Sequence, residues 1–414
     1  MSLKIVFFNR SFYPDITATS QLLTELCEDL VKDYDCRVTA VAGMPLKDYY
    51  PREYSKGKII QRENFKGIEI LRVKNTTFSP NFFLGRLSNY LTYFFLSFIA
   101  SFRLTKPDLV ITLTDPPIIG LVGLWVCRRF NIPLIISVRD IFPEAAKGLA
   151  DFQSKIINFL LDCINRFCLK KADHIIALGN LMSKRLIDEK GINDHKISII
   201  SDWVDCAQIF PVSKENVFSV SHSLVDNFVI MYAGNIGASS GLEFVIKSAK
   251  LLKDYKDILF VFIGEGIIKD KLIKLVDKHT LKNTKFFPYQ PKETLSYVFS
   301  SADIFILPLK KGLAGYSLPS KIYSILASGR PCIACVEEES EVAQIIQEFN
   351  CGLLSRPQDH QDLAEKILFL QKNKELRIRM GGNARNAAVF FDRPLGEKKY
   401  YELFRRLLKD KENL

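Results

Sequence analysis

Residues Phe228–Gly241 read FVIMYAGNIGASSG, an apolar run typical of a buried strand that opens into a turn with Gly234, Gly237 and Gly241. A helix is expected to follow over about Leu242–Lys253. Glycines let the backbone approach a ligand closely, and the free N–H groups at a helix start attract an anion. The pattern favours a phosphate site, although a β–α turn of any parallel α/β domain has the same outline.

Four more apolar runs after this turn predict strands of the same domain. They are Leu259–Ile263, Lys285–Pro288, Ile304–Leu309 and Cys332–Val336. The first run ends in a second glycine turn with Gly264 and Gly266, and Tyr289 follows the second run. Glu341 follows the last run, where a carboxylate suits ribose hydroxyls in doubly wound domains.

A helix is expected to start at Ser320, which we predict to cap it. Lys321 then lies in the first turn, where the helix dipole usually favours acids. A cation there is unfavourable unless an anion sits between it and the helix. We therefore expect Lys321 to contact an anionic ligand, with a solvated lysine as the alternative.

The first half of the chain alternates strand and helix patterns. Strands are expected at Lys4–Phe8, Val38–Ala42, Ile68–Val73, Leu109–Leu113, Leu134–Val138, His174–Leu178 and Lys196–Ile200. The clearest helix is Ser20–Lys32, which has leucines on one side. Such alternation predicts parallel strands with right-handed crossovers, and ligands bind beyond the carboxyl ends of such strands.

Polar residues follow several of these strands. The loop Asn9–Asp15 leads into a helix, and a Thr-Asp-Pro-Pro kink exposes Asp115. Arg139, Asp140 and Glu144 follow the fifth strand, and a group of charges there is hard to explain as core. Alternatively, Arg139 pairs with one of the two acids.

The composition predicts a folded protein of two domains, because 414 residues exceed one ordinary core. Lysine and arginine number 57 against 46 acids, and the net charge of +11 suits an anionic partner. No nucleic-acid-binding motif occurs, and nucleic acid is not expected as a partner. The nine cysteines, including Cys127, Cys163 and Cys168, are expected to be reduced buried thiols of a cytosolic protein. Cys332 and Cys335 have redox spacing but lie in an apolar run that favours a core strand.

The segment Phe78–Lys106 contains Leu87–Phe102, sixteen residues without a charge. A bilayer span needs about 20 apolar residues, so this run is too short to cross a membrane. Arg86, Arg103 and Lys106 flank it. Two interpretations stay open: a buried helix of the first domain, or a helix that enters a membrane interface.

Five segments resemble, in order and spacing, the donor-binding domain of family 4 glycosyltransferases, which have the GT-B fold. They are YAGNIGASSGLEFVIKSA, FVFIGEG, SSADIFILPL, LPSKIYSILASGRP and SEVAQIIQEFNCGLL. FNRSFYPD, TDPP and SVRDIFPE are similar to the acceptor domain of the WbuB-type enzymes that build bacterial surface polysaccharides. The resemblance implies an α/β protein with two doubly wound, Rossmann-like domains facing a cleft. We expect an acceptor domain at 1–205, a linker at 206–227, a donor domain at 228–392 and a C-terminal helix at 393–414 crossing back to the first domain.

The resemblance implies a retaining transfer of a sugar from a nucleotide diphosphate-sugar, with neither a metal nor another cofactor. The donor is expected to be UDP-linked and of the N-acetylated hexosamine type, and the acceptor a lipid-linked saccharide. The catalytic residues implied are Lys321, Arg139 and Asp140. The donor-binding residues implied are Gly234, Asn235, Gly237, Gly264, Gly266, Tyr289, Leu318, Ser320 and Glu341. The acceptor-side residues implied are Tyr13, Thr19, Asp115 and Glu144. We expect a cytoplasmic protein, peripheral on the inner face of the cytoplasmic membrane through Phe78–Lys106.

Two other functions are compatible with the sequence. One is a UDP-sugar epimerase of the same fold, although the five histidines are poorly placed for acid–base work. The other is a non-catalytic nucleotide-sugar-binding subunit. It is suggested by Tyr316 and Ser324, which stand where family members often carry two glutamates. Ser240, which stands where a lysine is common, is a further departure from the family pattern.

Overall fold

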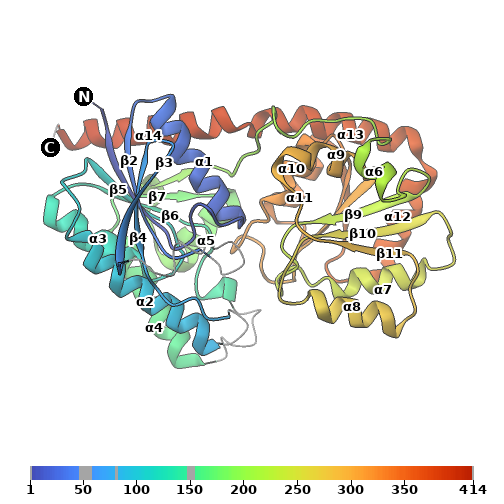
Figure 1. The fold of residues 1–414 in the computed structure, drawn as a ribbon, viewed down its shortest axis with the longest axis horizontal. Coiled ribbons are helices and arrows are strands. Elements are labelled where there is room, and N and C mark those ends of the chain that lie inside the picture. The colour runs from blue at the N-terminus through green and yellow to red at the C-terminus, as the bar shows by residue number, and fades with distance from the viewer. Residues whose placement is uncertain (1, 46–57, 80–82, 147–153, 413–414) are drawn as a thin grey trace. The chain divides into compact units, whose positions relative to one another are not determined.

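The computed structural model describes residues 2–45, 58–79, 83–146 and 154–412, and the chain divides into two compact units (Figure 1). Unit 1 comprises Met1–Ser201 and Gly396–Leu414, and unit 2 comprises Asp202–Leu395. Residues 206–227, expected as a linker, lie within unit 2, where the Val212 amide donates to the Ser300 hydroxyl at 3.0 Å. Each unit contains its own sheet, as predicted for two α/β domains.

Unit 1 is built on a sheet of eight strands within the described residues. In spatial order they are β3 (Ile60–Phe65), β4 (Ile68–Val73), β2 (Arg37–Ala42), β1 (Lys4–Phe8), β5 (Leu109–Thr112), β6 (Leu134–Ser137), β7 (His174–Ala177) and β8 (Ile197–Ile199). All neighbours pair parallel except β3 and β4, which form an antiparallel pair. The apolar runs do not predict β3, because four of the six residues of this edge strand are polar and only Ile60 is buried.

Helices connect the strands of unit 1. They are α1 (Ala18–Lys32), α2 (Phe83–Ser101), α3 (Gly120–Phe130), α4 (Lys155–Lys171) and α5 (Asn180–Lys190), with short 3₁₀ turns at Glu144–Ala146 and Asp194–Lys196. Helix α1 buries Leu23, Leu26 and Leu30, the stripe that its sequence predicts. Helix α2 confirms a helix within Phe78–Lys106, of which residues 80–82 lie outside the described residues.

Unit 2 has a sheet of six parallel strands within the described residues. In spatial order they are β11 (Thr284–Phe287), β10 (Ile258–Ile263), β9 (Phe228–Ala233), β12 (Ile304–Pro308), β13 (Cys332–Cys335) and β14 (Gly352–Ser355). The helices are α6 (Val217–Ser221), α7 (Glu243–Leu251), α8 (Lys269–Lys278), α9 (Leu295–Ser300), α10 (Lys321–Ala327), α11 (Glu341–Phe349), α12 (His360–Lys372) and α13 (Lys374–Ala388), with 3₁₀ turns at Lys292–Thr294 and Val389–Phe391. The five strands expected here are confirmed to within about one or two residues.

The cysteines divide into eight that are buried and one, Cys163, that is exposed. Cys332 and Cys335 are fully buried in β13, so the core-strand interpretation of this pair is confirmed. The nine cysteines are all free, and eight of them are buried. The expectation for Cys163 is wrong, because this thiol is exposed on the outward side of α4.

The last helix, α14 (Arg393–Glu412), begins in unit 2, and its residues from Gly396 onward belong to unit 1. The Tyr400 hydroxyl lies 3.3 Å from the Ser137 hydroxyl, at the end of β6. The ring of Tyr401 lies 4.3 Å from that of Tyr34, between α1 and β2. These contacts pack α14 against unit 1.

Candidate functional site

The strand order of unit 2 creates a topological switch point between β9 and β12. From β9 the chain proceeds outward through β10 and β11, whereas β12, β13 and β14 lie on the other side. The loops that follow β9 and β12 therefore diverge, and ligands of doubly wound sheets bind where this occurs. The predicted donor residues all follow the carboxyl ends of β9 to β13, which are parallel, so they lie along one edge of the sheet.

The two glycine turns of unit 2 are in direct contact. A Cβ atom on Gly264 would lie 2.1 Å from the Gly234 carbonyl oxygen, and one on Gly266 would lie 2.3 Å from the carbonyl of Ile236. Gly234 and Gly264 have φ values of +129° and +137°, which side chains rarely permit. The Ile236 amide also donates to the Glu265 carbonyl at 2.8 Å. The turns after β9 and β10 thus form one rigid backbone surface that only glycines allow.

Lys321 is held against this surface by a tyrosine. Its ammonium donates to the Tyr232 hydroxyl at 2.6 Å, and this hydroxyl donates to the Asn235 carbonyl at 2.5 Å. The Lys321 Nζ lies 3.4 Å from where a Cβ on Gly234 would be. In the described part of the chain, no carboxylate forms a salt bridge with Lys321. The site therefore offers an ammonium group, fixed by a neutral partner, beside a glycine turn.

Sequence reasoning missed Tyr232, Lys310 and Glu337. Tyr232 is buried near the end of β9, where it looks like a core residue, and its position two residues before Gly234 is the only signal. The Lys310 side chain lies 3.2 Å from where a Cβ on Gly241 would be, which brings a second cation to this edge. Glu337 accepts from the Gly312 amide at 2.9 Å and so holds the loop that begins at Lys310.

The other predicted donor residues lie along the same edge. Tyr289 lies beside the Gly264 turn, 3.5 Å from the Glu265 carbonyl oxygen. Leu318 is buried just before α10, and Glu341 begins α11 with 8% of its surface exposed. The prediction for Ser320 as a cap is wrong: it occupies the N-cap position with helical φ and ψ, and its side chain makes no capping hydrogen bond.

The sheet of unit 1 has its own switch point, between β1 and β5. There Arg10 bonds both carboxylate oxygens of Asp115, at 3.3 Å from Nε and 3.1 Å from a terminal nitrogen. The Ser11 hydroxyl donates to the same carboxylate at 3.1 Å. Burial opposes the charged form of Arg10, but the charge and hydrogen bond of Asp115, together with Tyr90 and Asp15, more than offset this and raise the pKa of Arg10. The predicted residue Asp115 thus lies at the switch point, already paired with a cation.

Arg139 and Asp140 are positioned by their backbone. Both amides donate to the Thr114 hydroxyl, at 3.1 Å and 3.3 Å, which ties the loop after β6 to the loop after β5. Both side chains are half-buried. Thr114 carries no such signal in the sequence, because its partners are 25 and 26 residues away.

Glu144 lies in a buried ion-pair network. The fully buried Lys190 ammonium donates to Glu144 at 2.7 Å, to Asp162 at 2.6 Å and to the Phe142 carbonyl at 3.0 Å. This network joins α4, the end of α5 and the loop after β6. It accounts for Glu144 without a ligand, since a buried ammonium requires such partners.

The remaining predicted residues of unit 1 lie near the start of α1. The Tyr13 ring stacks on Phe65 of β3 with 3.6 Å between centroids, and the Tyr13 carbonyl accepts from Arg72 at 2.7 Å. Thr19 is half-buried in the first turn of α1. Both residues follow β1, on the same edge of the sheet as Asp115.

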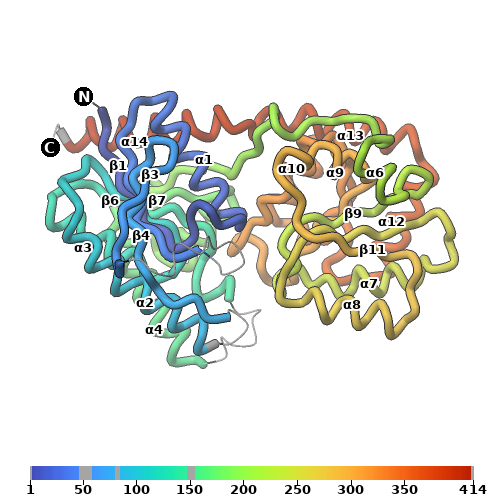
Figure 2. Tube along the Cα trace, viewed as in Figure 1, coloured from blue at the N-terminus to red at the C-terminus, as the bar shows by residue number. Residues whose placement is uncertain are grey.

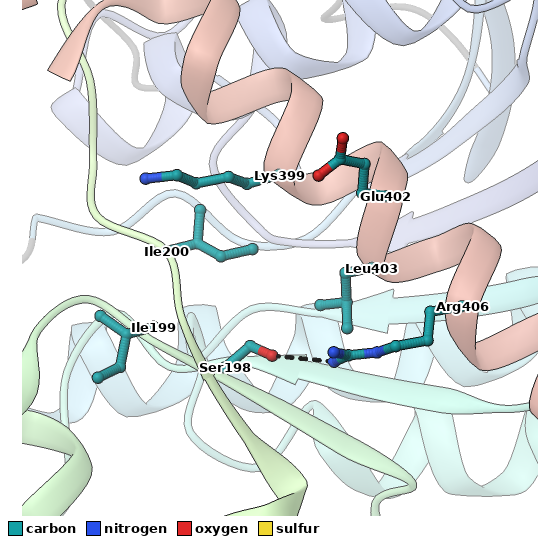
Figure 3. A pocket seen from close by; sticks show the side chains of 7 residues that line it. All are labelled: Ser198, Ile199, Ile200, Lys399, Glu402, Leu403 and Arg406. Atoms are coloured by element: carbon teal, nitrogen blue, oxygen red, sulfur yellow. Dashed lines mark hydrogen bonds between the residues drawn. The ribbon is translucent and has the colours of Figure 1, made fainter. Parts of the chain in front are cut away.

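A pocket of about 300 Å³ in unit 1 holds none of the predicted site residues (Figure 3). It lies between β8 and α14, and Arg406 donates to the Ser198 hydroxyl in its wall at 3.3 Å. It is lined by Ser198, Ile199, Ile200, Lys399, Glu402, Leu403 and Arg406. Because β8 is the edge strand of the sheet, the pocket is remote in topology from the switch point.

Two family models together match most of the chain. The model described as Glycosyltransferase Family 4 matches residues 20–208, and the model described as Glycosyl transferases group 1 matches residues 213–387. The chain belongs to the family 4 glycosyltransferases. The family predicted from the sequence segments is thereby confirmed, and the chain is a glycosyltransferase enzyme.

Several relatives are similar over much of their length. WbjE of Pseudomonas aeruginosa, named as a glycosyltransferase, is 26% identical over 287 residues, 68% of this chain and 71% of WbjE. WcaI of Escherichia coli K12, named for colanic acid biosynthesis, is 26% identical over 84% of this chain and 86% of its own. An N,N'-diacetylbacillosaminyl-diphospho-undecaprenol alpha-1,3-N-acetylgalactosaminyltransferase of Campylobacter jejuni is 22% identical over 63% of this family 4 chain and 67% of its own.

Solved structures confirm the GT-B fold. Sucrose-phosphate synthase from Thermosynechococcus elongatus has a TM-score of 0.79 at 16% identity and covers 99% of this chain and 100% of its own. Anabaena HepE in complex with UDP and glucose has a TM-score of 0.74 at 16% identity, and the match covers 98% of this chain and 100% of the HepE chain. These likenesses concern the fold alone.

Proposed function

We propose that the enzyme transfers a sugar from a UDP-sugar, with retention of configuration, to a lipid-linked saccharide during the synthesis of a surface polysaccharide such as O-antigen, capsule or exopolysaccharide. The sugar we expect is of the N-acetylated hexosamine type. The observation that carries the proposal is the Lys321 ammonium, which lies at the switch point of unit 2 and donates a hydrogen bond to the neutral hydroxyl of Tyr232. An anion is the ligand that suits this arrangement.

The geometry of unit 2 suits a diphosphate leaving group. When the bond from the sugar to the diphosphate breaks, negative charge develops on the phosphate oxygens, and fixed donors stabilise it. Lys321 and the backbone of the Gly234 turn supply such donors, because Tyr232 fixes both. A single preorganised donor typically contributes about 10²–10³-fold in rate. Gly264, Gly266 and Tyr289 form the adjacent wall, to which we assign the nucleoside.

The acceptor belongs at the corresponding edge of unit 1. We assign Arg139 and Asp140 to the transferred sugar, since Thr114 fixes the backbone of both. Tyr13, Thr19 and Asp115 follow the neighbouring strands and are assigned to the acceptor saccharide. Glu144 acts there through Lys190, by holding the loop that carries Asp140. In this mechanism the leaving phosphate helps to take the proton from the acceptor hydroxyl, and no enzymic nucleophile is needed.

The names of relatives support the choice of substrates. The Campylobacter jejuni relative is named for a diphospho-undecaprenol acceptor and an N-acetylgalactosaminyl donor, and a Staphylococcus aureus relative is named for capsular polysaccharide biosynthesis. The HepE structure was obtained with UDP and glucose. We infer that this chain works at the inner face of the cytoplasmic membrane. Among the described helices, none combines the length and the apolar character needed to cross a bilayer.

A nucleotide panel tests the proposal. UDP is expected to raise the melting temperature more than GDP or ADP, and UDP-N-acetylhexosamines are then assayed with an undecaprenyl-diphosphate-linked acceptor. Proton NMR of the product reports the anomeric configuration, and we expect the α configuration of the donor to be kept. A chelator such as EDTA is expected to leave the rate unchanged. Inversion at the anomeric carbon, or stabilisation by GDP alone, would contradict the proposal.

A further inference from the structure

Helix α4 carries an exposed apolar stripe. Ile156, Phe159, Leu160 and Phe167 are 74%, 66%, 54% and 44% exposed, and the exposed Cys163 lies between them. Their spacing of i, i+3, i+4, i+7 and i+11 places all five on one side of a helix. Single exposed apolar residues are ordinary, but a complete stripe of large ones marks an interaction surface.

The neighbouring helices extend this apolar surface. Helix α3 packs against both α2 and α4, and the three helices run along the same side of unit 1 (Figure 2). Trp125 of α3 is 39% exposed, and its ring lies 5.5 Å from Phe98 and 5.9 Å from Phe102. Further exposed apolar residues of the α2 segment are Leu84, Leu91, Phe95, Ile99 and Phe102.

Helix α2 has an inward face that explains the rest of its uncharged run. Tyr93 is fully buried and donates to the Val41 carbonyl at 2.8 Å. Asn89 accepts from the Phe78 amide at 2.9 Å and donates to the Phe78 carbonyl at 2.8 Å. The helix is therefore part of the fold of unit 1, and only its outward residues are available to a partner.

The three helices are strongly basic. Their residues include seven basic side chains and one acidic side chain, a net charge of 7 − 1 = +6. The basic residues are Arg86, Arg128, Arg129, Lys155, Arg166, Lys170 and Lys171. The acid, Asp162, is paired internally with Lys190 and Arg166, each at 2.6 Å. Burial alone would raise the pKa of Asp162, but the hydrogen bonds and charges of these two cations lower it.

We propose that this three-helix face, α2, α3 and α4, docks on an anionic lipid bilayer, with the stripe of α4 inserted at the level of the headgroups. The inference rests on the proposed lipid-linked acceptor and assigns the membrane contact to α4 as well as to α2. Apolar side chains on a basic helix are the combination that binds the interface of an anionic membrane. Each basic residue near the surface contributes about fivefold in affinity at moderate salt.

The charge of the three-helix face favours a membrane over a second copy of this chain as its partner. A twofold interface would place the same face on both subunits. It would bring a net charge of +6 against +6, and like charges that face each other across an interface are unfavourable. Anionic headgroups instead complement these charges.

Vesicle sedimentation with the full chain tests the proposal directly. The wild-type protein is expected to sediment with vesicles that contain 30% phosphatidylglycerol but much less with pure phosphatidylcholine. The double variant Phe159→Ser/Leu160→Ser is expected to bind the anionic vesicles at least about tenfold more weakly, because two large apolar side chains are lost. Phe369→Ser is the matched control, since this phenylalanine is 48% exposed on α12 of unit 2. Both variants should melt like the wild type.

A second variant tests the charge component. Lys170→Gln/Lys171→Gln is expected to weaken binding to anionic vesicles by about 25-fold, fivefold for each lysine, and to flatten its salt dependence. Equal binding by the wild type and Phe159→Ser/Leu160→Ser would overturn the proposal. The face would be a homodimer interface instead if the wild type did not bind vesicles, formed a dimer in solution, and became a monomer in Phe159→Ser/Leu160→Ser. Vesicle binding without sugar transfer would refute the proposed function and leave the docking surface standing.

Discussion

The switch points of the two units differ in how their cations are balanced. In unit 1, between β1 and β5, Arg10 is bound by both oxygens of Asp115. In unit 2, between β9 and β12, Lys321 is bound by the neutral hydroxyl of Tyr232 beside two glycine turns. The same topology therefore produces two different binding surfaces. In unit 1 the cation is neutralised by its own carboxylate, whereas the Lys321 ammonium of unit 2 has no carboxylate partner among the residues that the structure describes.

This difference indicates which ligand each unit receives. A charged diphosphate gains most where a fixed cation has no internal counter-ion. A saccharide, which is neutral, is better bound by paired charges that present directed hydrogen bonds without a net field. The comparison therefore supports the proposal that unit 2 binds the diphosphate and that unit 1 binds the hydroxyl groups of the acceptor.

The largest expected effect comes from Lys321→Ala. Removal of the unmatched cation should lower kcat/KM for transfer by about 10²–10³-fold, equal to about 2.7–4 kcal/mol of transition-state stabilisation. Steady-state assays measure this, with Lys311→Ala as the control because Lys311 is an exposed lysine of the preceding loop. If Lys321→Ala had wild-type kinetics, the proposal that the Lys321 ammonium stabilises the diphosphate would be wrong.

Gly264→Ala should have the next largest effect. Its Cβ would lie 2.1 Å from the Gly234 carbonyl at a φ of +137°, so the two turns must separate. We expect a loss of about 1–3 kcal/mol in the free energy of unfolding, together with loss of UDP binding. Denaturant unfolding measures the first quantity. Gly382→Ala in α13 is the matched control, because nothing lies within 4 Å of its Cβ position and alanine favours a helix.

Asp115→Asn tests the neutral surface of unit 1. The change leaves the Arg10 charge unmatched, and we expect it to cost about 1–2 kcal/mol in stability, less than a fully buried pair, because both side chains are partly exposed. The KM for the acceptor should rise while UDP affinity stays the same. A rise confined to the KM for the UDP-sugar would reverse the assignment of the two units.

The smallest effect is expected from Tyr232→Phe. The variant keeps the ring and removes the hydroxyl that joins Lys321 to the Asn235 carbonyl. One hydrogen bond of this kind contributes about 1 kcal/mol, so UDP affinity should fall about fivefold. Calorimetry would detect this change, and an unchanged affinity would show that Lys321 needs no such support.

The sequence predicted the backbone of both switch points because apolar runs and glycines are local signals. Phe228–Ala233, Gly234 and Gly264 lie where the pattern indicates. Local sequence patterns could not predict pairs of side chains that lie far apart in the chain. Glu144 meets Lys190 46 residues later, and Lys321 meets Tyr232 89 residues earlier.

Edge and surface features were also hard to predict. Strand β3 was missed because four of its six residues are polar and only Ile60 is buried. Cys163 was expected to be buried because it lies in an apolar run, but helical spacing places it on the outward stripe of α4. In both cases the periodicity, and not the apolar content, contains the information.

Isothermal titration of UDP into three proteins tests the central claim most directly: wild type, Lys321→Ala and Asp115→Asn. If the unmatched ammonium of unit 2 binds the diphosphate, Lys321→Ala should bind UDP at least tenfold more weakly, with Asp115→Asn equal to the wild type. Undiminished UDP affinity in Lys321→Ala, with a loss in Asp115→Asn, would contradict the account.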